Sequence, residues 1–187
     1  MSQLKVNSII PVSGVPTGGG GGIVQTVIGE QRSNVSQSVD GAANGSSSVL
    51  SAQITPTSSS SKVKISGTIN LGMSNPSNVI YVKLFKNSSV LSAASSSESA
   101  GNRQTGTVSV AYVDHSWQMA TVSFSFLDSP STTSQTTYQI FLGHSAGSNM
   151  TLYVNRSHNN NDTGDYANTG SFIILEEVSA WLLPCII

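Results

Sequence analysis

The sequence predicts an all-β protein: an antiparallel β-sandwich, jelly-roll-like, with an extended N-terminal arm. Only 9% of the 187 residues are Asp, Glu, Lys or Arg, against about 25% in ordinary globular domains. Ser, Thr, Asn and Gly must therefore supply the polar surface, and the first three favour strands and turns because they compete with helical hydrogen bonds. Short apolar–polar alternations separated by turn residues recur along the chain and indicate about nine or ten strands.

The first 22 residues are expected to form an attachment arm outside the sandwich. Five consecutive glycines at 18–22 separate this arm from the first strand, and such a run acts as a flexible joint that packs no core. The sandwich domain is therefore assigned to residues 23–180, and a separate apolar tail to residues 181–187. The apolar side chains of the arm that we expect to contact a partner are Leu4, Val6, Ile9 and Ile10.

The clearest strand is at residues 62–71, where apolar and polar side chains alternate without a break. Such alternation is typical of a strand with one buried face. Residues 30–48 indicate a polar connection, whereas the nearly continuous apolar run at 171–179 predicts a central strand covered on both faces. The expected strands, in chain order, are 23–28, 49–54, 62–71, 79–86, 107–113, 118–127, 137–142, 150–155 and 171–179.

The inward faces of these strands are expected to form the core. Successive side chains of a strand point to opposite faces, so each alternating strand contributes every second residue. A register error of one residue would turn all of them outward. The core residues predicted in this way are Val63, Ile65, Ile69, Val122, Phe124, Phe126, Ile140 and Leu142.

The last seven residues, WLLPCII, have no place in a sandwich that strand 171–179 already completes. Pro184 cannot donate to a β-ladder, so this tail is expected to lie as an extended peptide in a groove or a subunit interface. Its predicted partner-binding residues are Trp181, Leu182 and Leu183.

Charge and cysteine content exclude several classes of protein. The net charge is −1 and there is no basic stripe, so nucleic-acid binding is not expected. No apolar run approaches the ~20 residues of a membrane span, and the N-terminus lacks a signal-peptide pattern, so membrane insertion is not expected. The single cysteine, Cys185, excludes an intramolecular disulfide framework.

The three histidines, His115, His144 and His158, are each predicted to lie in a turn or loop. Their spacing matches no His-x-His or Glu-x-x-His ligand pattern, so no metal site and no cofactor are expected. In a threefold assembly, one histidine near the axis could still meet two copies of itself and bind an ion. His158 is the candidate for that arrangement.

Residues 156–169 form a long polar loop, which is the candidate receptor-facing surface. Its oxygen-bearing side chains do not match the spacing of a helix-flanked calcium loop. An ion pair of Arg156 with Asp162 or Asp165 is expected to order the loop. The residues predicted to face a receptor are Arg156, His158, Asn160, Asp162 and Tyr166.

No enzymatic activity is expected. The chain has no Gly-x-Ser-x-Gly nucleophile elbow. Glu176 and Glu177 are adjacent on a strand and point to opposite faces, so they cannot act together, and Asp128 with Glu98 is the alternative acid pair. Aromatic side chains that could stack on sugars at an outer surface are Trp117, Tyr112, Tyr153 and Tyr166.

Four motifs resemble one class of proteins. SPSTTSQTTYQI followed by YVNRSH and SFIILEE, together with the opening LKVNSIIPVSGV and its glycine run, is similar to small bacteriophage virion proteins of the tail-fibre or tail-protein type. The resemblance covers most of the chain but is anchored at its two ends. It implies a structural protein, a homotrimeric tail-fibre or tail-appendage module, with no catalytic residues to carry over.

The expected partners are other virion proteins, further copies of the same chain and a host surface glycan. The expected location is the virion, after assembly in the cytoplasm of the host bacterium. A capsid decoration (cement) protein is the alternative within the same class. A carbohydrate-binding host-recognition module and a glycan hydrolase are alternatives from other classes, distinguished by glycan binding and by release of reducing ends.

Overall fold

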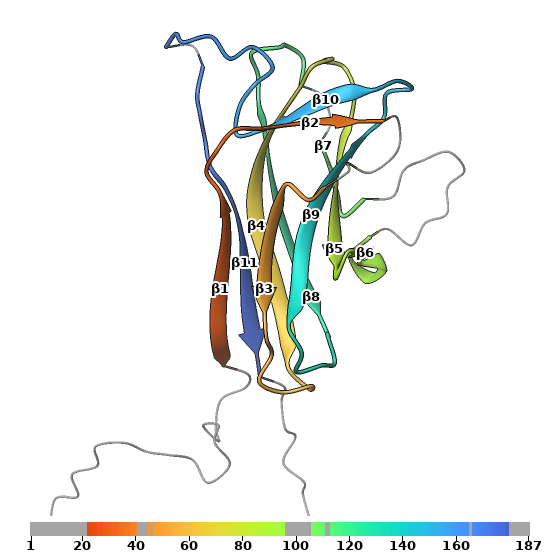
Figure 1. The fold of residues 1–187 in the computed structure, drawn as a ribbon, viewed down its shortest axis with the longest axis vertical. Helices are drawn as coiled ribbons and strands as arrows, with labels where there is room; N and C mark the ends of the chain where they lie inside the picture. Colours follow the sequence, from red (N-terminus) through yellow and green to blue (C-terminus); the bar gives the residue numbers. More distant parts are fainter. Residues whose placement is uncertain are drawn as a thin grey trace, which may run out of the picture.

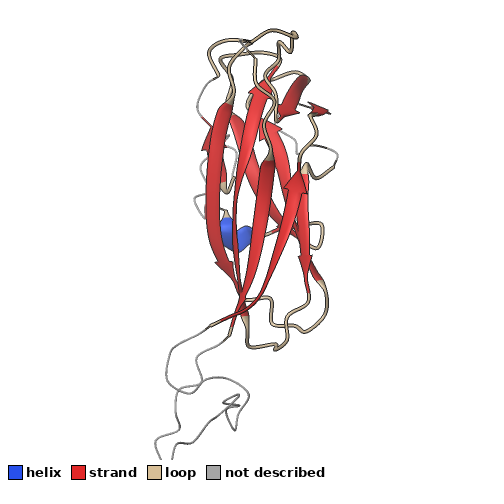
Figure 2. Ribbon diagram, turned by 90° about the vertical axis from the view of Figure 1, so that its left-hand side faces the viewer, coloured by secondary structure: helices blue, strands red, loops and turns tan. Residues whose placement is uncertain are grey.

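A computed structural model describes residues 22–40, 45, 47–95, 106–110, 113–164 and 166–179. They form an elongated sandwich of two antiparallel sheets (Figures 1 and 2). The antiparallel β-sandwich predicted from the sequence is therefore confirmed. Within these ranges the helical structure is the 3-10 turn η1 (Ser92–Ala94), and no helix there is long and apolar enough to cross a membrane.

The first sheet is organised around its longest strand, β4. One edge of β4 pairs with β8 over most of its length. The other edge of β4 pairs with β11 along the first half of β4 and with β10 at the last residues of β4. β4 therefore joins the pair β1–β11 and the pair β10–β2 into one sheet. The strands of this sheet are β1 (Ile23–Gln31), β2 (Val35–Val39), β4 (Lys62–Met73), β8 (Ala120–Asp128), β10 (Met150–Val154) and β11 (Ser171–Val178).

The second sheet is centred on β9 and β5. β9 pairs with β3 on one side and β5 on the other, and β5 also pairs with the short strands β6 and β7. The strands are β3 (Leu50–Ile54), β5 (Ile80–Lys86), β6 (Ser89–Val90), β7 (Val108–Val110) and β9 (Thr136–His144).

The core between the sheets contains the side chains that alternation predicts. Of the eight predicted core residues, seven are buried and Phe126 is partly buried against the others. β4 contributes an unbroken inward row, and Tyr138 and Ile140 of β9 pack opposite it with no exposed surface. The predicted faces of these strands are confirmed.

Two predictions about strands are wrong. Residues 35–39 lie in the stretch predicted to be a polar connection, yet they form β2 by pairing with β10 in register from Val35 to Val39. The alternation there is weak because only its two valines are apolar. β11 is central but not covered on both faces, since Phe172 on its outer face is 40% exposed.

The two ends of the described chain meet at one end of the sandwich. The amide of Ser179 donates a hydrogen bond of 3.1 Å to the carbonyl of Gly22. We call this the terminal end; it is the lower end in Figure 1. The loop between β10 and β11 lies at the opposite end, which we call the loop end (Figure 1).

Candidate functional site

Two loops are joined at the loop end of the sandwich. The loop 113–119 precedes β8, and the loop 155–170 follows β10. The amide of Asn159 donates a hydrogen bond of 2.9 Å to the carbonyl of Ser116, so residues far apart in the sequence share one surface. We call residues 114–118 and 156–164 the loop pair.

The base of the second loop is fixed by Tyr153 on β10. The guanidinium carbon of Arg156 lies 4.2 Å from the centre of the Tyr153 ring, a cation–π geometry. The hydroxyl of Tyr153 lies 2.9 Å from Nδ1 of His158. Arg156 and His158, both predicted from the sequence, are thus brought together, but on a tyrosine that is only 7% exposed.

The predicted ion pair between Arg156 and Asp162 does not form. The ion pairs within the described ranges are Arg32–Glu30, Lys64–Glu176 and Lys86–Asp128. The ring of Tyr153, three residues before Arg156, occupies the guanidinium face instead. Asp165 lies outside the described residues, so the second predicted partner is not placed.

The first loop presents an aromatic stack to solvent. The rings of His115 and Trp117 are parallel within 7°, with centroids 5.0 Å apart. Trp117 is 53% exposed. Oε1 of Gln118 accepts hydrogen bonds from the amides of Asp114 and His115, at 2.9 and 3.1 Å, and so closes this turn.

The remaining predicted receptor-facing residues lie in the loop that follows β10. Asn160 and Asp162 are exposed, and Tyr166 is half-buried, with its amide 3.3 Å from the carbonyl of Thr163. The predicted partner-binding residues and one candidate sugar-stacking residue lie outside the described residues: Leu4, Val6, Ile9, Ile10, Tyr112, Trp181, Leu182 and Leu183.

His144 is not in a loop, contrary to the prediction. It ends β9 and is fully buried. Because Nδ1 accepts from the amide of Ala146 at 3.2 Å, the contacts assign the proton to Nε2, which donates to the carbonyl of Val39 at 2.8 Å. In the part of the chain that the structure describes, no three His, Cys, Asp or Glu side chains gather to hold a metal ion.

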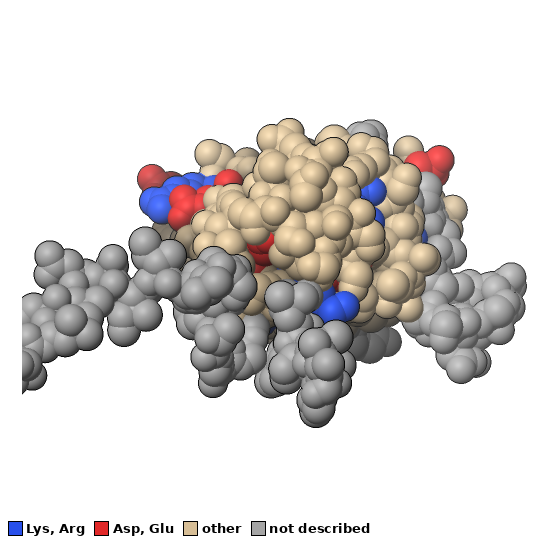
Figure 3. Space-filling model, turned by 90° about the horizontal axis from the view of Figure 1, so that it is seen from below, with Lys and Arg blue, Asp and Glu red and all other residues tan. Residues whose placement is uncertain are grey.

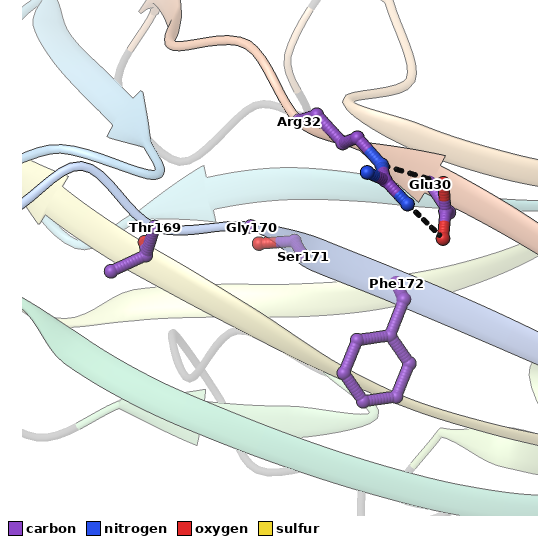
Figure 4. A pocket seen from close by; sticks show the side chains of 6 residues that line it. All are labelled: Glu30, Arg32, Thr169, Gly170, Ser171 and Phe172. Atoms are coloured by element: carbon purple, nitrogen blue, oxygen red, sulfur yellow. Dashed lines mark hydrogen bonds and ion pairs between the residues drawn. The ribbon is translucent and has the colours of Figure 1, made fainter.

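A pocket that the sequence did not predict lies on the outer face of the first sheet. Its volume is ≈ 330 Å³. Glu30 and Arg32 form a two-bonded ion pair at its rim, with distances of 2.8 and 3.1 Å (Figure 4). The hydrogen bonds and charge of Arg32 lower the pKa of Glu30, and those of Glu30 raise the pKa of Arg32. The lining residues are Glu30, Arg32, Thr169, Gly170, Ser171 and Phe172.

The charged groups of this pocket are paired with each other. Its two charges neutralise each other, and its remaining groups are hydroxyls, backbone and the ring of Phe172. Oγ1 of Thr169 is buried and has no hydrogen-bond partner among the residues that the structure describes. The pocket offers a mixed polar and apolar contact surface.

The buried carboxylates lie at the terminal end, far from the loop pair. Glu177 is fully buried and its oxygens accept from Nε2 of Gln25 at 2.6 Å and from the amide and hydroxyl of Thr57 at 2.8 and 2.7 Å. Burial alone would raise the pKa of Glu177, but these hydrogen bonds, with one from Ser61, outweigh it and lower the pKa. Glu176 is on the outer face, 2.8 Å from Lys64, so the two glutamates face opposite ways as predicted.

Asp128, the other buried carboxylate, is also bonded to internal partners. Its Oδ2 accepts from the hydroxyl of Tyr138 at 2.7 Å and lies 2.9 Å from Nζ of Lys86. Glu98, its predicted acid partner, lies outside the described residues. Both buried carboxylates are therefore structural groups with their hydrogen bonds satisfied.

The binding surfaces that the geometry offers are the loop pair with its exposed Trp117 and the outer pocket beside Phe172. Comparison with known proteins adds no family, because no protein-family model matches the chain and no curated protein matches its sequence.

Proposed function

We propose that this protein is a structural component of a bacteriophage virion, a trimeric tail-fibre or tail-appendage module that is attached at its terminal end. The observation that carries the proposal is the hydrogen bond between Ser179 and Gly22. Because of it, residues 1–21 and 180–187 both join the sandwich at the same end. The opposite end is left to the loop pair, which suits a module anchored at one end and presenting loops at the other.

The character of the terminal end supports attachment there. Seen from below, most of the visible surface of this end is uncharged, and Lys, Arg, Asp and Glu side chains show in separate places (Figure 3). Two exposed lysines of β4 at this end are bonded to neighbouring side chains, Lys62 to Ser129 and Lys64 to Glu176. The buried Asp128 and Glu177 are directed to internal partners rather than to solvent. A weakly charged surface is suited to contact with another protein subunit, because little charge must be desolvated.

The outer face of the first sheet supports self-association. β1 is an edge strand of nine residues, and its apolar Ile23 and Ile28 are 60% and 57% exposed. Ile28 lies beside Ile174 of β11, and Phe172 follows on the same face. A long edge strand with exposed apolar side chains tends to pair or pack with another chain.

Sedimentation of the full-length protein tests the self-association. A trimer is expected at micromolar concentration, and Ile28→Lys with Phe172→Lys should shift it toward monomer. Val90→Lys is the matched control, since Val90 is 44% exposed on β6 of the other sheet. A monomeric wild-type protein would contradict the trimer.

Localisation in the particle tests the virion role. Gold labelling of a tagged chain should mark the tail, and removal of residues 1–22 should prevent incorporation while the β-sandwich still folds. Labelling of the capsid surface would instead support the decoration protein. Absence from purified particles would overturn both.

A further inference from the structure

We propose that Trp117, stacked on His115 in the loop pair, is the platform of a glycan-binding site that takes the apolar face of a pyranose ring. The inference deepens the proposed function, on which its biological setting rests, by naming a ligand class for the loop end. Nothing in it depends on the oligomeric state.

The exposure of Trp117 is unlike that of the other exposed apolar residues. Among the described residues, the large apolar side chains that are well exposed are Ile23, Val24, Ile28, Val90, Trp117, Leu127 and Phe172. All of them except Trp117 belong to strands, where a neighbouring chain could cover them. Trp117 lies in the loop before β8, at the loop end of the sandwich, and not on a strand.

The indole already packs on a neighbouring ring in the free protein. One of its faces packs on the imidazole of His115, with the two rings 7° from parallel. The turn that carries both rings is closed by a hydrogen bond of 3.0 Å from the amide of Gln118 to the carbonyl of His115, in addition to the two that Gln118 Oε1 accepts. A preorganised ring loses little conformational entropy on binding, which favours affinity on a small surface.

The side chains of the adjoining loop suit a sugar. The hydrogen bond from Asn159 to Ser116 places the run Asn159–Asn161 next to the loop that carries Trp117. Amide side chains offer both donors and acceptors to hydroxyl groups, and a flat aromatic ring offers an apolar face. A pyranose presents both surfaces at once, one ring face of C–H groups and a rim of hydroxyls.

The charges of the loop pair favour a neutral glycan over an anionic one. Arg156 is the cationic side chain nearest in sequence to the asparagine run, and its guanidinium is packed on Tyr153. Asp114 and Asp162 are exposed acidic residues of the same loops. An anionic polymer would meet these carboxylates, whereas a neutral hexose would not be repelled.

Binding of the intact protein to a microarray of bacterial surface polysaccharides tests the proposal, with fluorescence titration of the best neutral ligand. Wild-type protein should bind at least one glycan that contains neutral pyranoses. Trp117→Ala should weaken that binding by about tenfold or more, as expected for an anchoring aromatic residue. Trp117→Tyr should retain most of it, because the flat ring is kept.

Val90→Ala is the control, since Val90 is an exposed apolar residue on β6, outside the loop pair and outside the face proposed for self-association. It should bind like the wild type. His115→Ala, which removes the support of the stack, should weaken binding less than Trp117→Ala does. Equal melting temperatures would confirm that each variant is folded.

Three outcomes would overturn the inference: no binding to any glycan, binding that Trp117→Ala leaves unchanged, or loss of binding in Val90→Ala alone. Particle localisation is measured separately. A protein found in the tail that binds no glycan would refute this site and leave the virion role standing. Glycan binding by a protein that is absent from particles would support this site and refute the virion role.

Discussion

The hydroxyl of Tyr138 on β9 donates a hydrogen bond of 2.7 Å to Oδ2 of Asp128 on β8, and so connects the two sheets through the core. Lys86 of β5 lies 2.9 Å from the same oxygen. Burial, and then the hydrogen bond and charge of Asp128, raise the pKa of Tyr138 far above its ordinary value, so the phenol remains a donor. A buried polar connection of this kind fixes how the sheets are placed on each other.

Tyr138→Phe should therefore lower the free energy of unfolding by about 1 to 3 kcal/mol, because Asp128 loses a donor that water cannot replace. Urea unfolding at neutral pH measures the change. Tyr81→Phe, at a partly exposed position of β5, should change it by less than about 0.5 kcal/mol. Equal effects of both changes would show that the hydroxyl of Tyr138 contributes nothing specific.

Acid should destabilise the protein partly through Glu177. Its folded-state pKa lies below the ordinary value of 4.5, so its charged form stabilises the fold above that pH. This contribution is lost as the pH falls through the lower, folded-state pKa. The free energy of unfolding of the wild type, measured by urea unfolding at a series of pH values, should fall over that range.

Glu177→Gln should remove this part of the pH dependence. It should also cost about 1 to 3 kcal/mol at neutral pH, since its amide group would meet the donor of Gln25. Glu176→Gln, on the outer face of the same strand, is the control and should cost at most about 1 kcal/mol. A glutamine variant with the acid sensitivity of the wild type would contradict the assignment.

Phe124→Ala should destabilise the sandwich by about 3 to 5 kcal/mol, the range for removing a buried aromatic side chain. Phe124 is 6% exposed, and its ring lies over Gly67 of β4, where a Cβ atom would come within 2.7 Å of it. Thermal and urea unfolding measure the loss. Leu127→Ala on the same strand, at a side chain 51% exposed, should have a much smaller effect.

Asn155 should be difficult to replace. It is fully buried with a left-handed φ of 66°, and its Nδ2 donates to the carbonyls of Gln31 and Ser33 at 2.6 and 3.0 Å. Its Oδ1 accepts from the hydroxyl of Ser171 at 2.6 Å. Asn155→Ala should cost on the order of 2 to 4 kcal/mol, since buried groups lose their partners and alanine is strained at this φ.

Asn155→Gly separates the two causes. Glycine adopts the same φ without strain. The Asn155→Gly variant should therefore be about 1 kcal/mol more stable than Asn155→Ala, although it still lacks the side-chain hydrogen bonds. Chemical denaturation of both variants gives the comparison. A glycine variant as stable as the wild type would show that the side chain of Asn155 has no structural role.

The sequence by itself determined the fold class, most strands and the inward face of the core. Alternation in β4 predicted that Val63, Ile65 and Ile69 are buried, and they have no exposed surface. This succeeded because the side chains of a strand alternate between faces, so burial of one face leaves a local pattern of period two.

Tertiary structure decided the features whose partners are distant in the sequence. β2 is a strand because β10 pairs with it, and Asn155 is buried because its partner carbonyls belong to residues 124 and 122 positions away. Trp117 shares a surface with Asn159 because one backbone hydrogen bond joins two loops. No local pattern encodes such contacts, since they are fixed by the packing of two sheets whose strands come from the whole chain.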